Sequence, residues 1–536
     1  MLKTNVESLW LLALASKCES ITLLNTIALG FLFLLSCLII HLFFWAQPGG
    51  SAWGKHKFTK PKSSSNSPPI PGPKGLPIIG SMGLMSGLAH RKIAAAARAC
   101  QAQRLMAFSL GQTRAVVTCD PDVAKELLNS STFSDRPAKE SAYGLMFNRS
   151  IGFAPYGVYW TVLRKIAAAH LFCPKQIKAS EGQRVEIASQ VVDVLTSSVG
   201  RPAGIRVRDV LKLASLNNMM CSVFGRRYDI VSANPETEEL GDLVSQGYDL
   251  LGRLNWSDHL SFLADFDLQK IRFRCGQIVP RVNRFVGRII AEHKEAAKLG
   301  GEKKTGLDFV DVLLSLQGAD RLSESDMIAV LWEMIFRGTD TVAVVIEWVL
   351  ARLVLHPDVQ SKVHDELDKV VGRSRAVTES DLTDLVYLTA VVKEVFRLHP
   401  PGPLLSWARL AIKDSTVDGY HVPAGTTAMV NMWAIMRDPN VWTDPLTFNP
   451  DRFLGQGPNT EFSMLGSDLR IAPFGSGRRS CPGKTLGMST VNFWVATLVH
   501  EFQFMSCAQG VDLSEVLKLS CEMANPLMVK VRPRRC

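Results

Sequence analysis

The chain has 536 residues, of which 47% are apolar and 21% charged, close to the averages of globular proteins. This composition excludes a disordered chain and a multi-pass membrane protein. The eleven cysteines form no CxxC pair, which argues against zinc sites and a disulfide framework and favours a reducing compartment. Of the formal net charge of +10, a surplus of +5 lies in residues 1–76, with seven lysines and two glutamates. That distribution is typical of a membrane flank and not of a nucleic-acid-binding surface.

An apolar segment lies close to the N-terminus. Residues 21–46 read ITLLNTIALGFLFLLSCLIIHLFFWA, and at roughly 39 Å as a helix they are long enough to cross a bilayer with some tilt. We predict a transmembrane anchor helix. A cleaved signal peptide is the alternative, but the run is too long and no A-x-A-like site follows. Lysines cluster directly after the span, so the positive-inside rule places residues 1–20 in the lumen and the remaining chain in the cytosol.

Residues 47–76 form a basic, Pro-rich linker. Its serines predict a flexible tether, and the prolines of SPPIPGP stiffen the chain toward polyproline II geometry. We expect either a rigid spacer that sets the tilt of the following domain or an ordinary linker. Because no further low-complexity break occurs, residues 77–536 are expected to form one domain. The sequons at Asn129, Asn148 and Asn255 should carry no sugar on the cytosolic side.

Helical periodicity dominates the domain from about residue 92 to residue 371. Strand-like pieces such as AVVTC, YHVP and TTAMVNMWAI are few, so the pattern predicts a mainly α fold with small β-sheets. The longest helical pattern runs from about Ser325 to Leu355 and is stopped by His356-Pro357. Since it is apolar nearly all round, we predict a buried central helix.

Polar residues interrupt the middle of this helix, at FRGTDTVA. Thr339, Asp340 and Thr341 would be costly to bury without partners. One interpretation is local satisfaction, in which the threonines bond back to the preceding turn and Asp340 pairs with Arg337. The other is a locally opened helix that holds an acid and an alcohol against a reacting centre, as a proton relay requires.

Two further pairs have helical spacing. Glu394 and Arg397 lie three apart in KEVFRLHPP, and most such pairs are surface salt bridges. Trp160 and Arg164 lie four apart in YWTVLRK, which presents an indole N–H and a guanidinium on one face. Two donors suggest an anionic ligand, although an amphipathic helix with one aromatic anchor has the same pattern.

The strongest motif is APFGSGRRSCPG at residues 472–483. Its continuation, GRRSCPGKT, looks like a phosphate-binding loop, but five residues separate Gly477 from Gly483 where that loop needs four, and no clear strand precedes it. We therefore exclude nucleotide binding. What remains is F-x-x-G-x-R-x-C-x-G, which is filled by Phe474, Gly477, Arg479, Cys481 and Gly483.

This loop resembles the haem-binding loop of the cytochrome P-450 family, and the other motifs follow in that family's order. The resemblance implies a cytochrome P-450 fold with a single catalytic domain behind the anchor. Cys481 would be the thiolate ligand of haem b, and the glycines would let the flat macrocycle approach. Backbone N–H groups at the start of a helix from about Gly483 would lower the pKa of the thiol. Arg479 would meet a haem propionate.

The resemblance carries over to the other motifs residue by residue. The propionate-binding positions match Trp160, Arg164 and Arg409, and the buried structural group behind the haem matches Glu394, Arg397 and Arg452. Asp340 and Thr341 match the acid–alcohol pair that delivers protons for dioxygen reduction. The chain departs from the pattern at Arg337, where a small residue is usual, and at Val342, where a second hydroxyl is common.

The implied reaction is a monooxygenation. One oxygen atom of O2 would enter a C–H bond of an apolar small molecule, with electrons from NADPH arriving through the flavins of a partner NADPH-cytochrome reductase. The chain has no dinucleotide fingerprint of its own, and Arg478 is a candidate contact for the reductase. The segments FRGTDTVA, PGPLLSWARLA and DGYHVPAGTTAMVNMWAI look like the plant microsomal group, particularly the subfamily associated with organ and seed growth.

That narrower resemblance implies an endoplasmic reticulum membrane protein, with plant growth signalling as a candidate role. If Arg337 points into the pocket, a fatty acid is a candidate substrate, whereas the ion pair with Asp340 would remove that option. Two other classes stay open: a haem-thiolate isomerase or dehydratase that does not activate O2, and a non-catalytic haem sensor.

Overall fold

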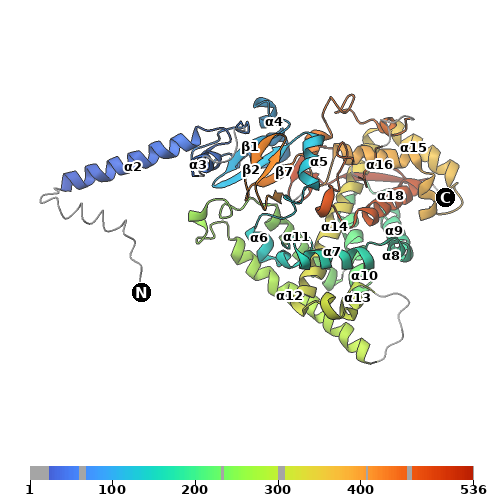
Figure 1. The fold of residues 1–536 in the computed structure, drawn as a ribbon. Helices are drawn as coiled ribbons and strands as arrows, with labels where there is room; N and C mark the ends of the chain where they lie inside the picture. Colours follow the sequence, from blue (N-terminus) through green and yellow to red (C-terminus); the bar gives the residue numbers. More distant parts are fainter. Residues whose placement is uncertain are drawn as a thin grey trace.

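The computed structural model describes residues 23–59, 68–230, 234–299, 308–405, 408–455, 462–466 and 468–534. The predicted lumenal segment 1–20 lies outside these residues. Helix α2 (Leu23–Trp45) projects from the body as a separate rod, at the end where α3, β1 and β2 lie (Figure 1). Its residues Thr26–Trp45 have a mean hydropathy of 2.6 and are 0% buried in the protein, so by length and composition this helix can span a bilayer.

Part of the predicted linker is folded. Helix α3 (Ser51–Thr59) lies against the strand β1, where the Trp53 Nε1–H group donates to the Phe108 carbonyl at 3.2 Å. The hydroxyl of Ser109 donates to the Gly49 carbonyl at 2.6 Å, and the Trp45 indole N–H donates to the Gly75 carbonyl at 2.8 Å. The described part of the linker is thus bonded to β1 near its start and to the anchor helix near its end.

Helices make up most of the domain, which confirms the predicted mainly α class. The longer ones that follow α3 are α4 (Ala89–Ala99), α5 (Pro121–Asn129), α7 (Val158–His170), α9 (Glu181–Thr196), α10 (Val207–Phe224), α11 (Pro235–Gly252), α12 (Ile271–Lys298), α14 (Glu324–Leu355), α15 (Pro357–Val370), α16 (Val386–Leu398) and α18 (Lys484–Glu501). The shorter ones are α6 (Glu140–Gly144), α8 (Pro174–Ala179), α13 (Phe309–Ser315) and α17 (Met432–Ile435).

In the part of the chain that the structure describes, four small sheets accompany the helices. The largest has the order β1-β2-β7-β4, in which β1 and β2 are antiparallel and β2 and β7 are parallel. Its strands are β1 (Met106–Leu110), β2 (Thr113–Thr118), β7 (Thr427–Val430) and β4 (Arg409–Leu410). The other sheets pair β3 (Ile205–Arg206) and β8 (Phe502–Ser506) with β11 (Met528–Pro533), β9 (Glu515–Leu517) with β10 (Cys521–Met523), and β5 (Ser415–Val417) with β6 (Tyr420–Val422).

One segment predicted as a strand forms a strand only in its first half. The piece TTAMVNMWAI forms β7 for its first part, and its end folds as α17. Asn431 separates the two because its side-chain oxygen accepts the Ala434 N–H at 3.1 Å and caps the helix.

Helix α14 runs through the middle of the helical layer (Figure 1). It begins after Ser323, whose hydroxyl accepts the Asp326 N–H, and it ends before His356-Pro357, as the sequence predicts. Trp332, Phe336 and Trp348 are fully buried, so the helix packs on all sides. It is α-helical throughout, and the predicted local opening at FRGTDTVA is wrong.

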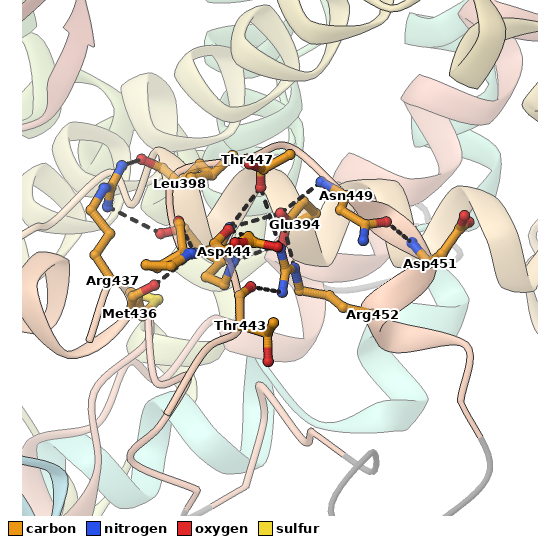
Figure 2. Close-up of polar contacts among 12 residues, drawn as sticks. Glu394, Leu398, Met436, Arg437, Thr443, Asp444, Thr447, Asn449, Asp451 and Arg452 are labelled. Carbon is orange, nitrogen blue, oxygen red and sulfur yellow. Dashed lines mark hydrogen bonds and ion pairs between the residues drawn. The ribbon is translucent and has the colours of Figure 1, made fainter. Parts of the chain in front are cut away.

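The described structure brings Glu394, Arg397 and Arg452 together. Both side chains of the Glu394–Arg397 pair are 0% exposed, and the guanidinium donates twice to the carboxylate at 2.7 Å. Arg452 adds a third contact at 3.2 Å, and the Asn449 backbone N–H donates a fourth at 3.0 Å (Figure 2). The remaining Arg397 donors go to backbone carbonyls of the chain that wraps around α16, including Met436 and Pro445.

Glu394→Gln should strongly destabilise the domain. The substitution leaves two guanidinium groups around a neutral amide in the interior, and breaking a buried ion pair from one side costs about 3–5 kcal/mol. Urea unfolding of the detergent-solubilised protein measures the loss. Asp451→Asn is the matched control, because its pair with Lys362 is more than half exposed. Equal unfolding midpoints for the two variants would contradict the structural role of Glu394.

Candidate functional site

Residues 472–483 form the turn that leads into α18 and rest against the end of α5. Gly475 and Gly477 have φ values of +66° and +67°, in the left-handed region. A Cβ on Gly477 would lie 2.0 Å from the Leu128 carbonyl oxygen, whereas one on Gly483 would lie 3.1 Å from the Phe172 ring. The glycines therefore serve backbone conformation and close packing against the protein. The approach of a macrocycle, inferred from the sequence, is not the constraint at Gly477.

Cys481 lines a cavity. Its surface is accessible to solvent, although protein atoms surround the sulfur densely. Burial raises the pKa of the thiol, while the charges of Arg337 and Arg164 and the Gly483 backbone N–H, which bonds to the sulfur, act in the opposite direction. Gly483 stands at the N-cap of α18, so the predicted helix terminus beside the sulfur is present.

The cavity has a volume of about 250 Å³. Its walls come from α5, α14, α18, β4, β7 and the Cys481 loop, and Phe474 lines it with its ring centroid 5.5 Å from that of Phe396. Thr341, Val342 and Val345 present one face of α14 to the same space. A nucleophilic sulfur and the centre of the longest helix thus share one mostly apolar cavity.

Five arginines and one glutamate line this cavity. The arginines are Arg136, Arg164, Arg337, Arg409 and Arg479, and the glutamate is Glu333. Burial, together with the charges of Arg479 and Arg164, lowers the pKa of the Arg409 guanidinium to about 9. Its Nη1 atom is buried with no hydrogen-bond partner. Because buried charges without partners are costly, a bound anion would stabilise this cluster.

The residues predicted to bind the propionates differ in how many of their hydrogen-bond donors the protein itself already uses. The Arg164 Nη1 group donates to the Ser480 carbonyl at 2.9 Å. Arg479 donates to the carbonyls of Ser134, Ile151 and Ala154 at 2.9, 3.1 and 2.7 Å. The indole N–H of Trp160 donates to the Ile151 carbonyl at 3.0 Å. The Trp160 ring also packs against Arg479, whose guanidinium lies 4.3 Å from the ring centroid.

Arg136 was missed by the sequence analysis. It lies in SDRPAK, donates to the carbonyls of Gly152 and Ala408 at 3.1 and 2.9 Å, and is buried beside Arg409 and Arg479. An isolated arginine before a proline carries no pattern of its own. It belongs to the arginine cluster only because the fold brings three distant segments of the chain together.

The residues present fit a haem group. Cys481 would supply the thiolate ligand of such a group, and the two carboxylates of the group would neutralise part of the arginine cluster, including the unpaired Arg409 Nη1. Cys481 would hold the iron, and Arg409 with Arg164, Arg479 and Arg136 would hold the propionates.

The two polar residues at the centre of α14 face different neighbours. Thr341 lines the cavity. Asp340 faces α10, where the Lys212 ammonium donates to its carboxylate at 3.3 Å. The predicted pair with Arg337 is therefore wrong, because Arg337 points to the cavity side instead. Thr339 bonds back to the Ile335 carbonyl at 2.7 Å, which confirms the expected local satisfaction for this threonine.

Glu333 is a second site residue that the sequence analysis missed. It lies one turn before Arg337, whose charge opposes the rise that burial causes in the pKa of this carboxyl group. Its Oε1 atom accepts the Gly152 N–H at 2.8 Å, and its Oε2 atom is buried without a hydrogen bond. The i, i+4 spacing of a glutamate and an arginine was readable in the sequence, but on an apolar helix it did not show which side faces a cavity.

Gly477→Ala should weaken the loop and reduce haem retention. The substitution forces a residue with a Cβ into the left-handed region, which costs about 1–3 kcal/mol, and adds a clash with the Leu128 carbonyl. Absorbance of bound haem per mole of purified protein measures the effect. Gly487→Ala is the control, since its Cβ would meet only Phe474, at 4.0 Å. Full haem content in the Gly477 variant would contradict the constraint.

Comparisons with known proteins agree with this geometry. The sequence model described as Cytochrome P450 matches residues 70–526. Among similar proteins, Cytochrome P450 78A3 from Glycine max is 65% identical over 531 residues, covering 99% of both chains. Cytochrome P450 78A9 from Arabidopsis thaliana is 63% identical, again over 99% of each. Flavonoid 3',5'-hydroxylase CYP75B138 from Crocosmia x crocosmiiflora is 34% identical over 89% of this chain and 93% of its own.

The family match covers most of the chain, and it includes the cavity, the Cys481 loop and all of α14. Proteins of this family are oxygenases that bind haem b through a cysteine thiolate. The chain belongs to the cytochrome P450 family.

Proposed function

We propose that this protein is a membrane-anchored monooxygenase that inserts one oxygen atom of O2 into a C–H bond of an apolar small molecule. The observation that supports this most directly is the placement of Cys481 and Thr341 in one cavity, with an arginine cluster at its side. Bound haem would supply the dioxygen chemistry, in which two electrons and two protons accompany one O2 and the second oxygen atom leaves as water.

The protein's own residues would do the remaining work. Cys481 holds the group from one side through its sulfur, and Arg409 and Arg479 orient it through their charges. Val345 on α14 and Phe474 on the Cys481 loop line the cavity with apolar side chains, which would exclude water from it. Asp340 and Thr341 move protons toward the reacting centre. An isomerase or a haem sensor would need the cysteine and the arginines but not the acid and the alcohol.

We also propose an electron donor and a membrane location for this protein. Electrons would come from NADPH through a membrane-bound reductase, with Arg478 as one candidate contact on the surface. Helix α2 would anchor the chain in the endoplasmic reticulum membrane with the domain on the cytosolic side. Of the three sequons, Asn129 is exposed while Asn255 is buried, so a glycan at Asn129 is the informative sign of the opposite orientation.

Cys481→Ala should abolish the haem-thiolate spectrum. The reduced wild-type protein exposed to carbon monoxide should show a strongly red-shifted Soret band, because the thiolate donates electron density to the iron. The variant should lack it, and NADPH with reductase should drive product formation only in the wild type. A band that survives the substitution would refute Cys481 as the ligand. A normal band without NADPH-driven turnover would favour the sensor or the isomerase.

The substrate class is the finer part of the proposal. Arg337 lines the cavity, and a single glutamate accompanies five arginines there, so a substrate carboxylate would find a positive environment. An apolar chain with one carboxylate, as in a fatty acid, matches the apolar walls and this charge. Its oxygenated product would be a candidate signal in plant growth.

Arg337→Ala should weaken fatty-acid binding by about tenfold, or about 1.4 kcal/mol, because the substitution removes the proposed partner of the carboxylate. Type I spectral titration with a fatty acid measures the dissociation constant. The methyl ester of the same acid is the control ligand and should bind both proteins alike. Equal fatty-acid affinities for the wild type and the variant would exclude the carboxylate contact and leave the monooxygenase proposal standing.

A further inference from the structure

A cluster of charged side chains lies between α10, α14 and β10, on the side of α14 that faces away from the cavity. Helices α10 and α14 lie next to each other in the helical layer (Figure 1). The members of the cluster are Arg208 and Lys212 from α10, Asp340 and Glu347 from α14, and Glu522 from β10. Lys518, four residues before Glu522, joins it from the surface. The catalytic roles assigned above use only Asp340.

One half of the cluster is closed. The Arg208 Nε group lies 2.7 Å from the Glu347 carboxylate, and both side chains are buried. A second Arg208 donor goes to the Met523 carbonyl at 2.8 Å, and the second Glu347 oxygen accepts the Leu527 N–H at 2.9 Å. These groups join α10, α14 and the C-terminal strands, and the Arg208 Nη1 atom also lies 3.7 Å from Glu522 Oε2.

The other half opens to solvent. The Lys212 Nζ atom lies 3.3 Å from Asp340 Oδ2 and 3.7 Å from Glu522 Oε2. The other Glu522 oxygen lies 2.5 Å from the Lys518 Nζ atom. The exposed fraction of the side chain is 54% for Lys518 and 35% for Lys212, but 11% for Asp340 and 4% for Glu522. A continuous series of ionisable groups therefore runs from the surface to the acid on α14.

Asp340 stands where this series meets the cavity. Its neighbour in the chain, Thr341, lines the cavity, so the carboxyl group and the hydroxyl lie on adjacent residues of one rigid helix. Burial raises the pKa of Asp340, while the charge and the hydrogen bond of Lys212 lower it. The other ionisable groups that interact with Asp340 are Glu522, Lys518 and the buried Tyr248 of α11.

We propose that Lys212, assisted by Glu522, is the solvent-side entry of the proton route to this active site. The Lys212 ammonium gives a proton to Asp340 Oδ2: one N–H bond breaks and one O–H bond forms. The amine then takes a proton from hydronium or a buffer acid in the solvent, so that the solvent supplies the net proton. Asp340 then passes the proton toward Thr341. This step rests on the proposed monooxygenase function, which consumes two protons in each turnover.

Of the basic residues near Asp340, a lysine is a better proton donor than an arginine. An arginine cannot release its proton at physiological pH, so Arg208 and Arg337 can supply charge but not protons. A lysine can, and Glu522 holds its ammonium within reach of Asp340. The distances of 3.3 and 3.7 Å are longer than those of the closed Arg208–Glu347 half, which leaves the ammonium room to move between the two carboxylates.

Lys212→Met and Lys212→Arg separate proton transfer from charge. With Lys212→Met, product formed per NADPH should fall, hydrogen peroxide release should rise, and the turnover rate should drop by at least about tenfold. Turnover should also become more sensitive to D2O, because proton delivery becomes limiting. Lys212→Arg keeps the positive charge and should stay slow. Lys178→Met, which breaks an exposed pair with Glu181 on another face, is the matched control and should behave as the wild type.

Wild-type turnover in Lys212→Arg would overturn the proton-donor role and leave only a role for charge, and so would an unchanged D2O effect in Lys212→Met. Intact red-shifted carbon monoxide bands in all variants are required as a check that the haem site is preserved. Failure of wild-type turnover itself would refute the proposed function instead.

Infrared titration of the Asp340 carboxyl group gives a readout that does not depend on activity. The band is assigned by its loss in Asp340→Asn. Lys212→Met should keep the carboxyl protonated to a higher pH than in the wild type, since the group that lowers its pKa is gone, whereas Lys212→Arg should leave the titration nearly in place. An unshifted titration in Lys212→Met would show that Lys212 does not control the Asp340 proton, and the proposal would fall.

Discussion

The concentration of positive charge inside the main cavity is the constraint on which the rest of the site depends. Five guanidinium groups and one carboxylate line the space above Cys481, where burial makes every unbalanced charge costly. Backbone carbonyls from three segments take up most of the donors of Arg479 and Arg136. The remaining positive charge fits the propionates of a haem, and the same charge lowers the cost of ionising the thiol.

Helix α14 connects this cavity to the solvent side of the domain. Because side chains repeat every 3.6 residues, one helix presents different chemistry on each face. Glu333, Arg337 and Thr341, spaced four apart, face the cavity. Asp340 turns instead to α10 and meets Lys212. Two adjacent residues of one regular helix thus place a hydroxyl in the cavity and a carboxylate in the ion-pair cluster beside α10.

The rigid framework behind the site comes from a second buried charge group. Glu394 accepts from Arg397, Arg452 and the Asn449 backbone, and Arg397 in turn holds carbonyls of the chain around it. This arrangement ties α16 to the segment that precedes the Cys481 loop. At the other end of the domain, α3 binds to β1 through Trp53, and the last residue of α2, Trp45, donates to the Gly75 carbonyl. The described part of the linker therefore holds the end of the anchor helix against the domain.

The sequence by itself determined the anchor helix, the bounds of α14 and the position of Cys481 before a helix, because each depends on local pattern: an apolar run, an N-cap with a terminal proline, and a glycine-rich turn. It also placed Glu394, Arg397 and Arg452 in one group through the family resemblance. Only the tertiary structure decided that Asp340 pairs with Lys212 and not with Arg337, that Arg136 and Glu333 belong to the cavity, and that α3 docks on the sheet. Those contacts join residues distant in the chain or depend on which face of a uniformly apolar helix meets which neighbour, and helical periodicity alone does not specify either.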